Sequence, residues 1–278
     1  MKHLLQRSTE IYQDNGVIDL IRAAKRFVVN GSLRDELLNL LPATEHVLRW
    51  YLRLGRSVYP SQYTDADPFK VLWVDPDTIL YDVSNSSIPM RFGKVYDGDW
   101  DQNRMRVANK SVYQTLKSHF KDDIPWCETE YYMQKRKKLE EGRSIRGCTT
   151  VDDLPDYFSR YDNLYNELKS EGYKSQRTLS KESPSDTIRQ NLDAPKPSMN
   201  EIGVCIGRDG DLLLGYRGVH RLSIAKLADV DSVAVQVLVR HQEWQSIRDE
   251  IVNTNKTNSS IEIQEYADHP DLRDIVRV

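Results

Sequence analysis

A glycine corner followed by two basic residues is the part of the sequence with the clearest chemistry. Residues 215–221 read GYRGVHR, and an amphipathic pattern typical of a helix follows. The first turn of a helix carries unpaired backbone N–H groups and a partial positive charge, so it attracts anions. Arg221 can make a forked contact to a phosphate, and His220 can donate a hydrogen bond or carry a proton. We therefore predict a phosphate-binding site at Gly218, His220 and Arg221, with Arg217 assisting.

A purely structural role is the alternative for this corner. His220 and Arg221 would then pair with acidic neighbours, and the corner would only connect a strand to a helix. A glycine followed by polar residues occurs in many loops, so the local pattern leaves both interpretations open.

Several carboxylates are candidates to complete such a site. Phosphoryl transfer needs a grip on the phosphates, a metal ion to neutralise charge and a carboxylate that accepts a hydroxyl proton. Mg²⁺ uses one or two protein carboxylates for this purpose. The candidates are Glu167, Glu171, Asp209 and Asp211. The alternative is a solvated surface position, or turn formation in the case of Asp209.

Further residues are candidates for the same cleft. Arg240 and His241 end a predicted strand, where ligand-binding groups are commonly presented. Trp244 would either stack on a base or sugar or anchor the core. Residues 98–101, GDWD, place two carboxylates around a tryptophan, in an acceptor pocket or in an exposed acidic turn.

The elements that must position these residues lie on both sides of the corner. They are a strand at 202–206 (IGVCI), a tight turn at 207–210 (GRDG), a return strand at 211–215 (DLLLG), a helix at 219–229 and a strand at 232–239 (SVAVQVLV). The last run is continuously apolar and β-branched, which is typical of a strand buried on both faces. Gly218 is expected to adopt a conformation that a side chain would forbid.

The whole chain is expected to divide into four regions. These are a helical N-terminal region (1–58), an α+β region packing on the core (59–150), the core itself (151–245, with a flexible loop at 175–200) and a C-terminal helix and tail (246–278). Helices are predicted at 111–120, at 128–142 and at 152–171, the last closed by Gly172.

Composition limits the classes of protein that remain. The net charge of −3 argues against a dedicated nucleic-acid coat, so DNA binding would need a local basic patch. The three cysteines lack C-x-x-C spacing, which predicts no zinc site and suits a reducing compartment. From the polar N-terminal residues and the lack of a long apolar run, we expect no secretory signal and no transmembrane segment. We expect a cytoplasmic protein, or one peripheral at the membrane surface.

The order of these elements resembles the core of the ParB/sulfiredoxin superfamily. The matching order is strand, Asp-Gly turn, strand, G-x-H-R corner, helix and strand, and YDNLYNELKSEGYKSQ (161–176) resembles the helix that precedes it in that superfamily. The resemblance covers roughly residues 155–245, under half of the chain. It implies an α+β fold with a mixed sheet and helices.

Departures from the superfamily's patterns narrow the implied function. Partition ParB proteins carry G-E-R-R where this chain has Gly218, Val219, His220 and Arg221. The 33 residues after the core (246–278) are expected to be too few for their helix-turn-helix module. Sulfiredoxins carry G-C-H-R, and Val219 replaces their catalytic cysteine. Neither activity is therefore expected. The corner is similar to the G-H-H-R of the superfamily's free-serine kinases, which move a phosphoryl group from a nucleotide to a small hydroxyl.

The resemblance also implies roles for individual residues. It brings the helix end at Glu171 close to the corner, so Glu171 is the expected base. From the chemistry of the residues themselves, we predict His220 as a second catalytic residue and Glu171 and Asp209 as Mg²⁺ ligands. The expected function is a nucleotide-binding enzyme that uses ATP, ADP or CTP for phosphoryl transfer to a hydroxyl-bearing acceptor, or for nucleotide hydrolysis. The alternatives are a ParB-like DNA-binding protein or nuclease, and a non-catalytic nucleotide-binding regulatory module.

Overall fold

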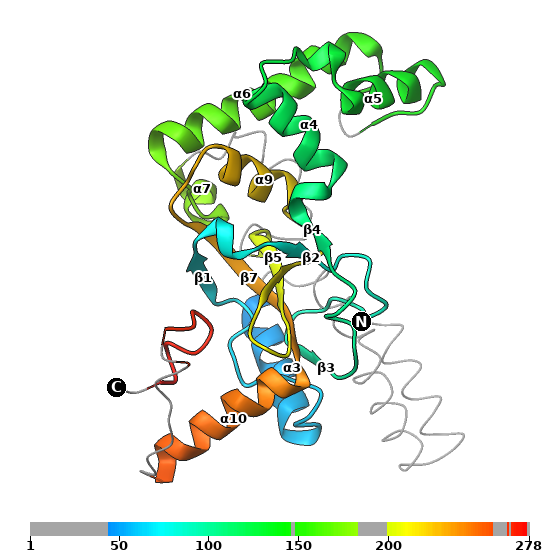
Figure 1. Ribbon diagram of the computed structural model, residues 1–278. Helices are drawn as coiled ribbons and strands as arrows, with labels where there is room; N and C mark the ends of the chain where they lie inside the picture. Colours follow the sequence, from blue (N-terminus) through cyan, green and yellow to red (C-terminus); the bar gives the residue numbers. More distant parts are fainter. Residues whose placement is uncertain (1–43, 146–147, 183–198, 258–265, 267, 277–278) are drawn as a thin grey trace, which may run out of the picture. The chain divides into compact units, whose positions relative to one another are not determined.

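The computed structural model describes residues 44–145, 148–182, 199–257, 266 and 268–276 (Figure 1). They fall into two compact units, one ending at Tyr63 and one beginning at Thr64, and each is described by itself. The helices predicted within residues 1–43 lie outside the described residues.

The described part of the first unit is helix α3 (Thr44–Val58) and the residues that follow it. Leu48, Tyr51 and Leu52 form its buried face. The chain after the helix packs on this face: the ring of Tyr63 meets the ring of Tyr51 edge-on, with centroids 6.2 Å apart. The helix predicted for this segment is confirmed.

The second unit is built on a mixed sheet. Its described strands are β1 (Val71–Val74), β2 (Tyr81–Asp82), β3 (Lys94–Tyr96), β4 (Met105–Arg106), β5 (Ile202–Ile206), β6 (Leu212–Leu214) and β7 (Val233–His241). They follow the order β1-β7-β5-β6-β2-β4, and β3 also pairs with β7. β7 runs parallel to β5 and antiparallel to β1, while β5 and β6 form an antiparallel hairpin. The expected α+β class is confirmed.

Strand β7 is an interior strand of this sheet, with β5 on one edge and β1 and β3 on the other, and its sequence is mostly apolar. Every residue from Val233 to His241 is buried. The β-branched residues of such a run pack well on a pleated surface, and a strand with neighbours on both edges and both faces needs no solvent-facing side chains. The prediction of a strand buried on both faces is confirmed.

Helices cover the sheet and extend from its ends. They are α4 (Ser111–Phe120), α5 (Glu130–Glu140), α6 (Leu154–Glu171), α7 (Gln176–Glu182), α9 (Val219–Leu227) and α10 (Gln242–Thr257), with short 3-10 turns η1 (Pro76–Thr78), η2 (Val107–Asn109), η3 (Trp126–Glu128) and η4 (Val151–Asp153). α9 buries Leu222, Ile224 and Ala225 in the main core, and α4 and α6 pack against it. These three helices lie at one end of the sheet, and α10 continues from β7 at the other end (Figure 1).

Two segments differ from the sequence-based expectations. The region 59–150 does more than pack on the core, since it supplies β1, β2, β3 and β4 to the same sheet. Part of the predicted flexible loop is helical, because Gln176–Glu182 form α7. Ser175 starts this helix by accepting a hydrogen bond from the backbone N–H of Thr178 at 3.1 Å. Residues 183–198 of that loop lie outside the described residues.

Over the described part of the chain, each helix is too short or too polar to cross a membrane.

Candidate functional site

The glycine corner has the geometry that its sequence predicts. Gly218 lies in the left-handed region, with φ 88° and ψ 10°, and immediately precedes α9. A Cβ at this position would lie 2.9 Å from Cα of Ile202, at the start of β5. Only glycine fits here, because both the backbone conformation and the close approach exclude a side chain. The corner thus sets the start of α9 directly against the start of β5.

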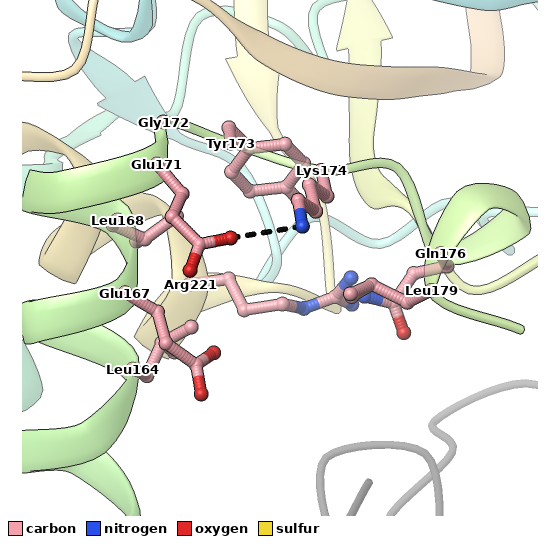
Figure 2. Close-up of a pocket in the computed structure, with 10 residues that line it drawn as sticks. All are labelled: Leu164, Glu167, Leu168, Glu171, Gly172, Tyr173, Lys174, Gln176, Leu179 and Arg221. Carbon is pink, nitrogen blue, oxygen red and sulfur yellow. Dashed lines mark ion pairs between the residues drawn. The ribbon is translucent and has the colours of Figure 1, made fainter. Parts of the chain in front are cut away.

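A small cavity of about 190 Å³ lies beside this corner (Figure 2). Its lining comes from the end of α6, from the turn that follows and from α7 and α9; the residues are Leu164, Glu167, Leu168, Glu171, Gly172, Tyr173, Lys174, Gln176, Leu179 and Arg221. Glu171 and Arg221, which the sequence analysis selected from separate segments, therefore line one cavity.

Arg221 is the buried cation of this cavity. Its exposed fraction is 8%, and its Nη1 has no hydrogen-bond partner among the described residues. The side chain extends from α9 toward Gln176 and Leu179 on α7 (Figure 2). A buried guanidinium nitrogen without a partner is costly, so this arrangement favours an anion in the cavity.

The cavity also holds two carboxylates and a second cation. Glu171 ends α6, and its Oε2 lies 2.9 Å from Nζ of Lys174. This hydrogen bond raises the pKa of Lys174 above its usual value. Glu167 lies one helical turn before Glu171 and lines the same cavity. Because 58% of the Glu171 side chain is exposed, this ion pair can open at little cost.

A buried glutamate behind the cavity was not anticipated from the sequence. Glu201, just before β5, is fully buried, and its Oε1 accepts a hydrogen bond from the backbone N–H of Gln176 at 2.7 Å. Burial raises the pKa of Glu201 to about 7, although Arg221 and the α7 amides oppose the shift. The only hint in the sequence was a charged residue directly preceding an apolar strand.

Tyr173, which follows α6, is a buried-hydroxyl residue of the cavity lining. Burial raises the pKa of the Tyr173 hydroxyl to about 12, with Arg221 and Glu201 both acting on it. Within the described residues its hydroxyl has no hydrogen-bond partner. The ring of Trp73 on β1 meets the Tyr173 ring edge-on, with centroids 6.3 Å apart.

His220 faces a different part of the molecule from Arg221. Its Nε2 lies 3.2 Å from the hydroxyl of Tyr131 on α5, and its ring stacks on Tyr161 of α6 with centroids 5.3 Å apart. It is not among the residues that line the cavity. Successive residues of a helix point about 100° apart, so neighbours in sequence need not share a site. Of the predicted phosphate-binding residues Gly218, His220 and Arg221, the structure thus places His220 away from the cavity that Arg221 lines.

Arg217 also lies outside the lining. The side chain is buried, its guanidinium carbon lies 4.6 Å from the centroid of Phe92, and its Cγ packs close to Gly203. Its charge still acts on Glu201, whose carboxyl pKa it lowers. Arg217 thus acts electrostatically on Glu201 and does not line the cavity.

The residues predicted at the end of β7 belong to a structural network. Arg240 is buried, and its Nε donates to Oδ2 of Asp271 at 2.9 Å. Trp244 is buried and donates to the same oxygen at 3.1 Å. Of its two predicted roles, it therefore has that of a core anchor. His241 Nε2 donates to the carbonyl of Gly98 at 2.8 Å. Both side chains are thus bound to other parts of the fold, and neither is among the residues that line the cavity beside α9.

The second predicted metal ligand, Asp209, lies far from Glu171. Asp209 is exposed in the turn between β5 and β6, whereas the cavity lies beside the residues that precede β5. A five-residue strand spans roughly 17 Å, and Mg²⁺ holds its ligands at about 2 Å. Asp209 is not among the residues that line the cavity with Glu171. The described residues contain no group of three or more His, Cys, Asp or Glu placed to hold a metal.

The other acidic candidates are held by arginines. Asp211 pairs with Nη1 of Arg104 at 2.5 Å. In the GDWD stretch, Asp101 is buried and accepts hydrogen bonds from the backbone and side chain of Arg208. Although burial alone would raise its pKa, these bonds hold the pKa of Asp101 at about 2. This stretch therefore fastens the β5–β6 turn, and it is not part of the cavity beside α9.

Comparison with known proteins adds no relative. No family model, no curated protein and no solved structure matches the chain.

Proposed function

We propose that this protein binds a nucleotide through its phosphates in the cavity beside α9 and transfers a phosphoryl group to a small hydroxyl compound. The observation that carries the proposal is the placement of Glu171 and Arg221 in one cavity. The first residue is a carboxylate able to receive a proton, and the second is a buried cation able to hold a phosphate.

The size and charge of the cavity favour a phosphate group as the bound part of the ligand. A volume of about 190 Å³ is smaller than the roughly 300–1,000 Å³ typical of sites that enclose a drug-sized ligand. The phosphates would therefore enter, while the base and ribose would remain outside. Arg221 offers the planar donor geometry that matches phosphate oxygens, and Lys174 adds a second positive charge.

The same arrangement can support transfer of the terminal phosphoryl group. The acceptor hydroxyl oxygen attacks the terminal phosphorus, its proton passes to the Glu171 carboxylate, and the bond from phosphorus to the bridging oxygen breaks. The phosphorylated acceptor and the shortened nucleotide leave. Arg221 would hold the charge that develops on the phosphate oxygens, which is the main task of a protein in this reaction.

A divalent ion fits the carboxylates of the cavity better than the pair predicted from sequence. Glu167 and Glu171 are one turn apart on α6 and line the same cavity, and Mg²⁺ accepts one or two carboxylates together with substrate phosphates. Bound there, it would neutralise phosphate charge.

A thermal-unfolding panel tests the binding half of this proposal. ATP, ADP, CTP and GTP, each with Mg²⁺, are added to the wild type, Arg221→Ala, Arg221→Lys and the control Arg136→Ala, whose exposed side chain pairs with Glu140 on α5. At least one nucleotide should raise the melting temperature of the wild type and the control. The shift should vanish in Arg221→Ala and be reduced in Arg221→Lys, which keeps the charge but loses the fork. Equal shifts in all four proteins would contradict the proposal.

Turnover tests the catalytic half. Glu171→Gln should keep nucleotide binding and lose phosphoryl transfer to hydroxyl acceptors by a factor of about 10²–10⁴, the usual contribution of a positioned base. Glu130→Gln, an exposed change at the start of α5, serves as the control. The readout is the release of the shortened nucleotide.

A non-catalytic nucleotide-binding module is the second candidate. The ion pair between Glu171 and Lys174 favours it, because the Lys174 ammonium occupies a carboxylate oxygen that a catalytic base would use. Nucleotide binding without turnover in the wild type would select this candidate. Salt-sensitive retention on DNA with no nucleotide response would instead favour the DNA-binding interpretation.

A further inference from the structure

Glu201 is a buried acid whose second carboxylate oxygen is not used by the described fold. Oε1 accepts from the backbone N–H of Gln176, and the N–H of Arg177 also contributes, whereas Oε2 is buried with no hydrogen-bond partner among the described residues. This oxygen would be stabilised either by a hydrogen-bond donor or by taking up a proton. Gln176, whose backbone N–H donates to Glu201, lines the cavity together with Arg221, so the protonation of Glu201 has a consequence for the cavity.

The groups that face Glu201 come from four segments. Arg221 from α9 and Arg217 from the glycine corner act on it with positive charge, α7 directs two backbone amides at it, and the Tyr173 hydroxyl lies among them. The charged groups of the cavity itself are Glu167, Glu171 and Lys174. Arg221 is thus shared between a buried carboxylate on one side and the cavity on the other.

An anion in the cavity and an ionised Glu201 would compete for the same guanidinium. Two negative charges on either side of one buried cation repel each other, and the low local dielectric makes that repulsion strong. Protonation of Glu201 removes the competitor and leaves the full charge of Arg221 to the ligand. Burial already brings the pKa of Glu201 to about 7, so Glu201 gains or loses its proton near neutral pH.

We propose that Glu201 is a proton-controlled counter-charge to Arg221, so that the cavity takes up a proton at Glu201 when it binds a phosphate or sulfate anion. Glu201 does not line the cavity, so it acts through Arg221 as a positioning residue. The proposal rests on the anion site of the proposed function and adds its regulation by pH.

The direction of the pH effect follows from linkage. Below the pKa of Glu201 the acid is neutral and the anion binds tightly. As the pH rises through that pKa, binding must first return a proton to the carboxylate, and affinity falls. The fall for one linked proton is limited to tenfold per pH unit, and we expect about threefold or more between pH 6 and pH 8.

Sulfate is the probe of choice because it stays a dianion at both pH values. Its affinity is measured by calorimetry for the wild type, Arg221→Ala, Glu201→Gln and His220→Gln. Glutamine keeps an oxygen that accepts from Gln176 but cannot ionise. Histidine is the residue type that changes charge in this pH range. The variant His220→Gln therefore tests whether His220, which precedes Arg221 on α9, causes the pH dependence. Binding should weaken with pH in the wild type and in His220→Gln, stay constant in Glu201→Gln, and be absent in Arg221→Ala.

A second measurement needs no variant. Titration of the wild type at pH 7 in two buffers of different ionisation enthalpy reports proton uptake directly, and we expect uptake of up to one proton per bound sulfate. Zero uptake overturns the role of Glu201, as does an unchanged pH dependence in Glu201→Gln, and both leave the Arg221 anion site intact. If neither sulfate nor any nucleotide binds the wild type, or if Arg221→Ala binds as well, the proposed function fails together with this inference.

Discussion

Gly218 shows how much one residue contributes to the placement of the cavity. It combines a left-handed backbone with a close approach to Ile202, and these two constraints set the start of α9 against β5. The sequence predicted the first constraint from the corner motif. The second depends on a neighbour sixteen positions earlier, which no local pattern reports.

Gly218→Ala should therefore be more destabilising than an ordinary glycine substitution at positive φ. We expect a loss of about 2–4 kcal/mol in the free energy of unfolding, from backbone strain together with a displaced β5. Gly142→Ala is the matched control, because Gly142 also has a positive φ but its Cβ would meet no atom within 4 Å. It should lose only about 1 kcal/mol. Urea unfolding measures both, and equal losses would show that the approach to Ile202 is unimportant.

At the scale of elements, sequence periodicity predicted the individual helices and strands better than the pairing between strands. The hairpin of β5 and β6, the helices α4, α6 and α9 and the buried strand β7 match their predicted ranges closely, because each depends on its own apolar pattern. The pairing of β1 and β3 with β7 was not predicted, since it joins segments more than a hundred residues apart.

The candidate site follows the same division. Arg221 was selected from the chemistry of the glycine corner and Glu171 from the resemblance, and both line the same cavity. Glu201 was missed, because its burial depends on α7, which has too few residues for a clear period. His220 was misplaced, because the rotation of α9 is set by the tyrosines of α5 and α6 that it packs against.

The C-terminal segment around Asp271 is fastened by a buried ion network that should dominate its stability. Asp271 accepts from Arg240 and Trp244 and lies 3.2 Å from Nη1 of Arg248, and these cations hold the pKa of its carboxyl far below the usual value. Asp271→Asn would leave the buried Arg240 without its counter-charge. We expect a loss of about 3–5 kcal/mol in the free energy of unfolding.

A control for this network lies on the same segment. Asp274 pairs with Lys70 at 2.7 Å, but 49% of its side chain is exposed. Asp274→Asn should cost less than about 1 kcal/mol. Denaturant unfolding of the two variants compares them, and similar losses would mean that the Asp271 network contributes no more than a surface pair.

At the scale of the whole molecule, the second unit contains everything that the proposed site requires. The sheet, the cavity and the Asp271 network all lie between Thr64 and residue 276, and the division between the units falls directly after Tyr63. A region with its own core and sheet is expected to fold alone.

A chain that begins at Thr64 should therefore unfold cooperatively and keep the response to sulfate. Circular dichroism and calorimetry would measure both properties against the full-length protein. Loss of the cooperative transition would show that the first 63 residues are part of the same folding unit.

The edge-on contact between Trp73 and Tyr173 makes the cavity observable by light. Trp73 is 46% exposed, and its ring meets a tyrosine that forms part of the cavity wall. Indole emission changes with local polarity and nearby charge, so an incoming anion would alter the fluorescence of Trp73. Occupancy could then be followed in real time without a dye, and Trp73→Phe would identify the source of the signal.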